Sequence, residues 1–100
     1  MDTSDERGFL EAARIGDERA FSRLASIHGP GLREFCLFML GCPDRTQEAV
    51  CETLLRGWRN VDGVTPTISA RVWLYQLATN VCLEILDGTD ELRGRQPFEL

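Results

Sequence analysis

An indole and two side-chain amides recur at helical spacing in the C-terminal third of the chain. Between residues 69 and 86 and just beyond, aromatic and polar side chains fall at three- and four-residue steps, on one helix face: Trp73, Gln76, Asn80, Glu84 and Asp87. An indole beside an amide has the chemistry to stack on one nucleobase and hydrogen-bond another. A second interpretation stays open, in which Trp73 tucks its ring under the preceding loop and Asn80 is merely solvated.

Five other side chains suggest reactive or metal-binding chemistry: Cys36, Cys42, Cys51, Cys82 and His28. Their spacings match no paired zinc-ligand pattern, and no CxxC occurs. We therefore interpret the cysteines as thiols in a reducing compartment. His28 completes no nucleophile–base pair, and no phosphate-binding glycine loop is present. The sequence predicts no enzyme, no cofactor and no metal site.

The charge balance narrows the classes of partner. Eleven arginines and no lysine stand against sixteen acidic residues, which gives a formal net charge of −5. Non-specific binding to nucleic acid rests on lysine and arginine, so this balance argues against a general duplex-binding protein. It favours a protein partner, or a DNA contact made locally with the help of another subunit. The polar N-terminus resembles no signal peptide and no apolar run is membrane-length, which predicts a cytoplasmic protein.

The elements that must position these side chains are helices. A chain of 100 residues predicts one domain, and helical periodicity extends almost throughout. We therefore expect an all-α, compact bundle of four to five helices, with no sheet. Five helical segments are predicted, at about residues 5–15, 17–30, 31–40, 43–60 and 69–87. The helical domain is expected to comprise residues 1–88, followed by a polar tail or the start of an interdomain linker at residues 89–100.

Local signals set the expected helix boundaries. Ser4, Asp17 and Ser69 are predicted N-caps. Breaks are expected at Gly29-Pro30 and at residues 41–43, because proline lacks the amide that continues a helix. A loop with Gly63 and Pro66 is expected at residues 61–68. In the last helix, apolar side chains share a core face: Leu74, Leu77, Ala78, Val81, Cys82 and Ile85.

Three motifs occur in order: DERAF at residues 17–21, ETLLRGW at 52–58, and WLYQLATNVCL at 73–83. Together they resemble region 2 of bacterial sigma-70-family RNA polymerase sigma factors of the extracytoplasmic-function type, over about residues 17–86. The combination WLYxxAxN at residues 73–80 is its most specific part. The resemblance implies a non-enzymatic promoter-recognition domain that takes part in transcription initiation.

The resemblance also implies two interfaces. One helix docks on the β′ clamp helices of the RNA polymerase core. The next helix, with the loop before it, engages the promoter minus-ten element and captures a flipped base, which holds the strands apart. The implied docking residues are Glu48, Cys51, Glu52 and Arg56. Cys51 stands where the family usually has glutamine and Gln47 where an acid is common, so weaker polar contacts are expected.

The implied DNA-binding residues are Ser69, Arg71, Trp73, Gln76 and Asn80. Asn80 matches the family's asparagine near the base-capturing loop, and Trp73 matches the aromatic that opens the strand-separating segment. Ser69 and Arg71 match the polar and basic positions just before it. Tyr75 is expected to pack against the bundle rather than touch DNA.

The chain departs from the family after Leu86. Relatives continue with an arginine-rich helix end, whereas this chain has acids at Asp87 and at residues 90–91, and Gly88 ends the helix. Acids near phosphates oppose binding, which favours an alternative: a degenerate sigma-like domain that acts only through protein contacts, with polymerase or an anti-sigma factor.

A third hypothesis is an unrelated helical interaction module. The sequence shows no second domain of the kind that reads the minus-thirty-five element, and residues 96–100 resemble the start of a linker, so a fragment is favoured over a stand-alone protein.

Overall fold

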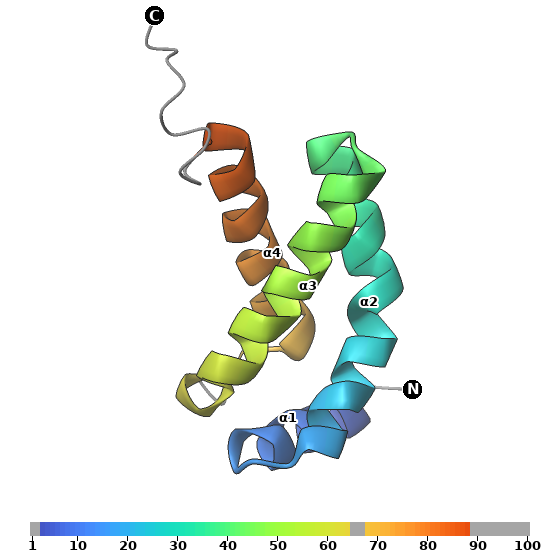
Figure 1. The fold of residues 1–100 in the computed structure, drawn as a ribbon. Helices are drawn as coiled ribbons and strands as arrows, with labels where there is room; N and C mark the ends of the chain where they lie inside the picture. Colours follow the sequence, from blue (N-terminus) through green and yellow to red (C-terminus); the bar gives the residue numbers. More distant parts are fainter. Residues whose placement is uncertain (1–2, 65–67, 89–100) are drawn as a thin grey trace, which may run out of the picture.

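The structure is a computed structural model that describes residues 3–64 and 68–88, with side chains from residue 6 onward. Within these ranges the chain forms four α-helices and one 3-10 turn (Figure 1): α1 (Thr3–Arg14), α2 (Glu18–Leu40), α3 (Pro43–Asn60), η1 (Val61–Gly63) and α4 (Ala70–Asp87). The described residues contain no strand, so the predicted all-α bundle is confirmed. None of these helices is both long and apolar enough to cross a membrane.

Three long helices form the body of the domain, and α1 lies across one end of it (Figure 1). The helices α2, α3 and α4 pack against one another, and α1 packs mainly on α2. A half-buried contact between His28 Nε2 and Glu6 Oε1, at 2.9 Å, joins α2 to α1. The helix α1 therefore closes one end of the core, while both predicted interfaces fall on the long helices α3 and α4.

Two predicted N-caps are confirmed. Oδ1 of Asp17 accepts hydrogen bonds from two backbone N–H groups in the first turn of α2, at 3.0 and 3.3 Å. Oγ of Ser69 accepts from the N–H of Val72 at 3.1 Å, which fixes the start of α4. Gly88 ends α4 as predicted, in the left-handed conformation with φ of 72°. The predicted cap at Ser4 is wrong, because α1 begins at Thr3 and Ser4 lies within its first turn. Acidic residues near this N-terminus favour the longer helix.

The break predicted at Gly29-Pro30 is wrong, since α2 continues through Pro30 to Leu40. Pro30 removes the hydrogen bond to the carbonyl of Ser26, but both residues are exposed, so water can bond that carbonyl. Gly29 has no Cβ to clash with the proline ring. The buried face also continues at helical spacing past the proline: Ala20, Phe21, Leu24, His28, Leu32 and Cys36. Burial of this face outweighs the local break signal.

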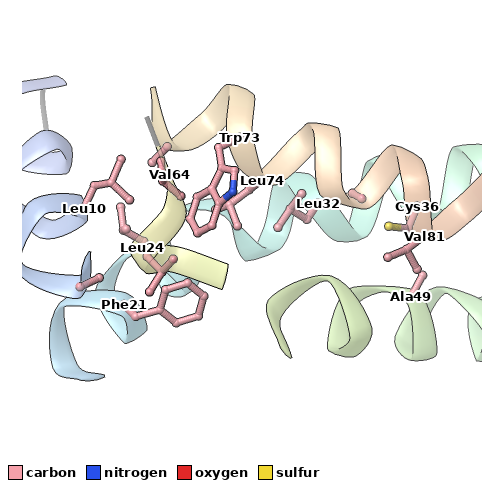
Figure 2. Packing of buried hydrophobic residues seen from close by; sticks show 14 of the residues in the cluster. Leu10, Phe21, Leu24, Leu32, Cys36, Ala49, Val64, Trp73, Leu74 and Val81 are labelled. Carbon is pink, nitrogen blue, oxygen red and sulfur yellow. The ribbon is translucent and has the colours of Figure 1, made fainter. Parts of the chain in front are cut away.

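The core fills the space between the long helices and α1 (Figure 2). Four of the six residues predicted for the core face of α4 are buried, and Leu77 and Ile85 pack partly buried against them. Two buried threonines of α3 satisfy their hydroxyls within the helix, because Thr46 and Thr53 donate to carbonyls four residues earlier at 2.9 and 2.7 Å. Gly57 lets α3 approach the Phe21 ring, which a Cβ there would meet at 3.2 Å.

Candidate functional site

The four predicted docking residues lie together along a groove of about 470 Å³ between α3 and α4. The lining residues of this α3–α4 groove are Arg45, Glu48, Cys51, Glu52, Leu55, Arg56, Val81, Glu84 and Ile85. Glu48 and Cys51 are exposed, whereas Glu52 and Arg56 are half-buried. The spacing of three and four residues along α3 brings these side chains to one face, which is why sequence periodicity could group them.

Arg56 is the centre of the polar contacts in the α3–α4 groove. Its Nε donates to Oε2 of Glu52 at 2.8 Å, while Nη1 and Nη2 donate to the two carboxylate oxygens of Glu84 at 3.0 and 2.7 Å. The hydrogen bonds to Glu84 and then Glu52 raise the pKa of Arg56 above its ordinary value. The hydrogen bonds from Arg56 lower the pKa of Glu84. One guanidinium therefore binds α3 to α4.

Sequence reasoning missed Glu84 as part of this groove. Glu84 was placed on the stripe with Trp73 and Asn80, whereas the structure turns its carboxylate toward Arg56. The two partners are 28 residues apart on different helices, so no local pattern could pair them.

Gln47 joins the edge of this surface to α2. Its Oε1 accepts from Nη2 of Arg33 at 3.0 Å, and its Nε2 lies 3.8 Å from Sγ of Cys51. The amide thus bridges an arginine of α2 and the thiol of Cys51. An acidic side chain at position 47 could still accept from Arg33, but it would have no N–H group to donate to Cys51.

Trp73 lies in the core and not on the exposed face that its spacing suggested. Its side chain is 8% exposed, with its ring edge-on to Phe21 at a centroid distance of 6.4 Å. Figure 2 shows the indole beside Val64, just before the loop that leads into α4. The prediction of a shared exposed stripe with Gln76 and Asn80 is therefore wrong, and the ring is buried as the second interpretation held. Residues 65–67 of the loop in that interpretation lie outside the described residues. Trp73 sits at the border of the buried face. At this position its large ring gains more free energy from burial than from exposure to water.

The other predicted DNA-binding residues are exposed on α4 or at its N-terminus: Ser69, Arg71, Gln76 and Asn80. None of them lines the α3–α4 groove. The guanidinium of Arg71 lies over the Tyr75 ring, 5.2 Å from its centroid. Tyr75 is half-buried and packs against the bundle as predicted, with its ring 5.4 Å from that of Phe35.

The two candidate surfaces differ in charge. No acidic residue occurs between Asp62 and Glu84, although the chain as a whole has a net charge of −5. The N-terminal end of α4 adds the partial positive charge of its free N–H groups, close to Arg71. The groove lining carries three carboxylates and two guanidinium groups, those of Glu48, Glu52, Glu84, Arg45 and Arg56. The N-terminal part of α4 therefore suits an anion, whereas the mixed charges of the groove suit a partner that offers charged or hydrogen-bonding groups.

The cysteines are free thiols, and two of them meet inside the bundle. Cys36 of α2 and Cys82 of α4 are buried with their side chains hydrogen-bonded to each other. Burial, followed by the contact with Cys82, raises the pKa of Cys36 to about 12, and burial also raises the pKa of Cys82. Across residues 3–64 and 68–88, no three side chains of His, Cys, Asp or Glu are grouped to hold a metal ion.

A family model described as sigma-70 region 2 matches residues 24–92, which contain both candidate surfaces. The chain belongs to the sigma-70 region 2 family. The resemblance carried by the three motifs is confirmed, and the hypothesis of an unrelated helical module is wrong. Sigma factors are transcription initiation factors and not enzymes, in agreement with the prediction from the sequence.

Relatives of this sigma-70 region 2 domain are extracytoplasmic-function factors. The chain is 37% identical over 84 residues to the ECF RNA polymerase sigma factor SigG of Mycobacterium tuberculosis, across 82% of this chain and 22% of SigG. It is 25% identical over 88 residues to the ECF RNA polymerase sigma factor SigW of Bacillus subtilis, across 88% of this chain and 44% of SigW. The chain thus spans less than half the length of these relatives.

Proposed function

We propose that this domain docks on RNA polymerase core through the α3–α4 groove and engages the promoter minus-ten element with the exposed surface of α4. The observation that carries the proposal is the separation of the two residue sets. Glu48, Cys51, Glu52 and Arg56 all line one groove, while Ser69, Arg71, Gln76 and Asn80 are exposed outside it. A domain with two such surfaces can hold polymerase and promoter at the same time.

The docking surface combines charge with an apolar contact. Glu48 and Cys51 are exposed for direct contact, and Leu55, which is half exposed, adds an apolar side chain to the same face. Arg56 is already held by Glu52 and Glu84, so in the free domain it fixes the shape of the groove. We propose the β′ clamp helices as the occupant. An anti-sigma factor is a further proposed partner for the same surface.

On the DNA side, each exposed residue has a distinct proposed role. The amides of Gln76 and Asn80 can donate to and accept from base edges, and Asn80 is proposed to bind the flipped base of the non-template strand. Flipping costs a few kcal/mol, which these contacts must offset. Arg71 and the capped N-terminus at Ser69 attract the strand. Trp73 is proposed to support the N-terminal end of α4 from within the core and not to stack on DNA.

An alternative is that the domain acts only through protein contacts. Asp87 at the end of α4 favours it, whereas the acidic positions at residues 90–91 and the arginines at 93 and 95 lie outside the described residues. Family membership and the absence of acidic residues between Asp62 and Glu84 favour the promoter-reading function instead. Because its proposed partners are polymerase and promoter, we place the protein in the cytoplasm.

The experiment that tests the DNA-reading role measures binding of this chain, with polymerase core, to single-stranded minus-ten DNA. Asn80→Ala is expected to weaken binding by about fivefold or more, the loss of one or two hydrogen bonds. Ser22→Ala, an exposed polar residue of α2 outside both surfaces, serves as the control. If core binding is intact and Asn80→Ala leaves DNA binding unchanged, the protein-contact alternative replaces the proposal.

Alkylation of the exposed thiol of Cys51 provides a separate test of the docking role. Polymerase core is expected to protect Cys51 from alkylation, because the groove would be covered. Cys42, which is half-buried at the N-terminus of α3 and does not line the groove, provides the internal control. Equal alkylation of Cys51 with and without bound core would place docking elsewhere on the domain.

A further inference from the structure

A shallow basin lies between α2 and α4, apart from the α3–α4 groove. This α2–α4 basin measures about 290 Å³ and is lined by Phe35, Arg71, Val72, Tyr75, Gln76 and Thr79. Two of these residues, Arg71 and Gln76, were predicted to bind DNA. Phe35 on α2 was not predicted to take part in any site, and Tyr75 was expected only to pack. The basin therefore brings a second helix to the candidate DNA surface.

Two aromatic rings and a guanidinium lie against one another in this basin. The Phe35 and Tyr75 rings meet edge-to-face, at a centroid distance of 5.4 Å and an interplanar angle of 63°. The guanidinium of Arg71 lies over the Tyr75 ring, 5.2 Å from its centroid. Attraction between the cation and the ring restrains Arg71, which lowers the entropy cost of presenting it to a ligand.

Gly31 of α2 has no side chain, and this leaves room for the Tyr75 ring in the basin. The hydroxyl end of Tyr75 occupies the position that a Cβ on Gly31 would take, so any larger residue there must displace the ring. Gly31 has an ordinary helical conformation, since its φ is not positive. A glycine inside a helix is less favourable than alanine, and the close approach of Tyr75 gives this residue a structural reason.

The chemistry of the basin fits an unstacked nucleobase. Aromatic and guanidinium planes stack on bases of any sequence, and a neighbouring amide can hydrogen-bond a base edge. Arg71 is the charged residue in the lining, and the whole run between Asp62 and Glu84 is free of acids. This charge complements the phosphates of a nucleic-acid strand and opposes a basic protein helix.

We propose, resting on the function proposed above, that the α2–α4 basin binds one unstacked base of the opened promoter strand. The base stacks on the outer face of the Arg71 guanidinium, and Gln76 contacts its edge. Tyr75 and Phe35 act as positioning residues, because Tyr75 restrains Arg71 and both rings shape the basin. This base is distinct from the one assigned to Asn80, which does not line the basin.

The test uses 2-aminopurine, placed at each position of the non-template minus-ten strand in turn, in the complex of this chain with polymerase core. At one position, emission is expected to be quenched by stacking in the wild type and restored in Tyr75→Leu. The affinity for that strand is expected to fall about fivefold or more. Because Tyr75→Leu removes packing area, its thermal unfolding is measured in parallel.

Gly31→Ala provides the sharper variant. It removes no aromatic ring, and alanine favours the helix, but its Cβ displaces the Tyr75 hydroxyl. It is expected to restore 2-aminopurine emission at the same position as Tyr75→Leu does. Gly8→Ala in α1 is the matched control, since nothing lies within 4 Å of the added Cβ, and it is expected to leave emission quenched.

Three results would overturn the inference. If quenching persists in Gly31→Ala and Tyr75→Leu while Asn80→Ala still weakens DNA binding, the basin holds no base although the proposed function stands. If both basin variants weaken binding to core without DNA, the basin is a protein contact. If neither the basin variants nor Asn80→Ala changes any DNA signal, the proposed function itself fails.

Discussion

Arg56 of α3 holds Glu84 of α4 through two parallel hydrogen bonds, of 2.7 and 3.0 Å, while its Nε binds Glu52 at 2.8 Å. The pair joins the helix proposed to dock on polymerase to the helix proposed to read DNA. A guanidinium suits this position because it presents several donors in a fixed plane, which an ammonium does not. This side chain therefore adds a polar link to the core packing that places the two proposed interfaces.

Arg56→Lys is expected to destabilise the domain modestly. Lysine keeps the charge but loses the bidentate contact, and a half-exposed pair of this kind contributes about 1 kcal/mol or less. Urea unfolding measures the change. Arg59→Lys, at an exposed position of the same helix, is the control and should unfold with the wild type. If Arg56→Lys and Arg59→Lys unfold at the same urea concentration, the planar arrangement of donors on the guanidinium contributes nothing to stability.

The contribution of Glu84 is expected to depend on pH. Hydrogen bonds from Arg56 lower the pKa of Glu84 in the folded state, so the carboxylate stabilises the fold above its ordinary pKa of 4.5. That contribution is lost as the pH falls below 4.5 and through the lowered value. The wild type should therefore be more stable than Glu84→Gln at neutral pH, and the difference should shrink in acid. Urea midpoints at neutral and acid pH measure it, and a constant difference would contradict the linkage.

The thiols are expected to differ sharply in reactivity. Alkylation requires the thiolate, and burial raises the pKa of Cys36 to about 12 and also raises that of its neighbour Cys82. Exposed Cys51 should be modified first in the native domain, whereas Cys36 and Cys82 should react only after unfolding. Mass spectrometry of alkylated peptides, with and without denaturant, makes the comparison. Rapid modification of Cys36 in the native state would mean that the α2–α4 packing opens readily.

The parts of this fold that sequence reasoning predicted correctly depend on neighbouring residues alone. The caps at Asp17 and Ser69 are local hydrogen bonds, and the core face of α4 follows from helical spacing. α2 continues through Pro30 because Ser26 is exposed to water and because side chains farther along the helix, up to about two turns from the proline, are buried in the core. That information exists only once the helices have packed, so a local break signal misled the prediction.

In the candidate site, too, the features that follow from local spacing could be predicted and those that join two helices could not. Periodicity along α3 brought Glu48 and Glu52 to one face, as the groove confirms. The Arg56–Glu84 pair and the contact of Phe35 with Tyr75 each join two helices, so neither has a sequence signal. Trp73 lies at the boundary between the two faces of α4, where the size of the ring and the space near Phe21 decide its direction.

The position of Trp73 leads to a prediction that separates its structural role from a DNA-stacking role. Trp73→Leu removes much of a ring buried against Phe21 and should destabilise the domain by about 2–4 kcal/mol, because it leaves a cavity. At a temperature where the variant is still folded, its affinity for minus-ten DNA with polymerase core should stay close to that of the wild type. Thermal unfolding and DNA binding are measured on the same preparation. A folded Trp73→Leu that loses DNA binding as strongly as Asn80→Ala would mean that the indole leaves the core to contact the promoter.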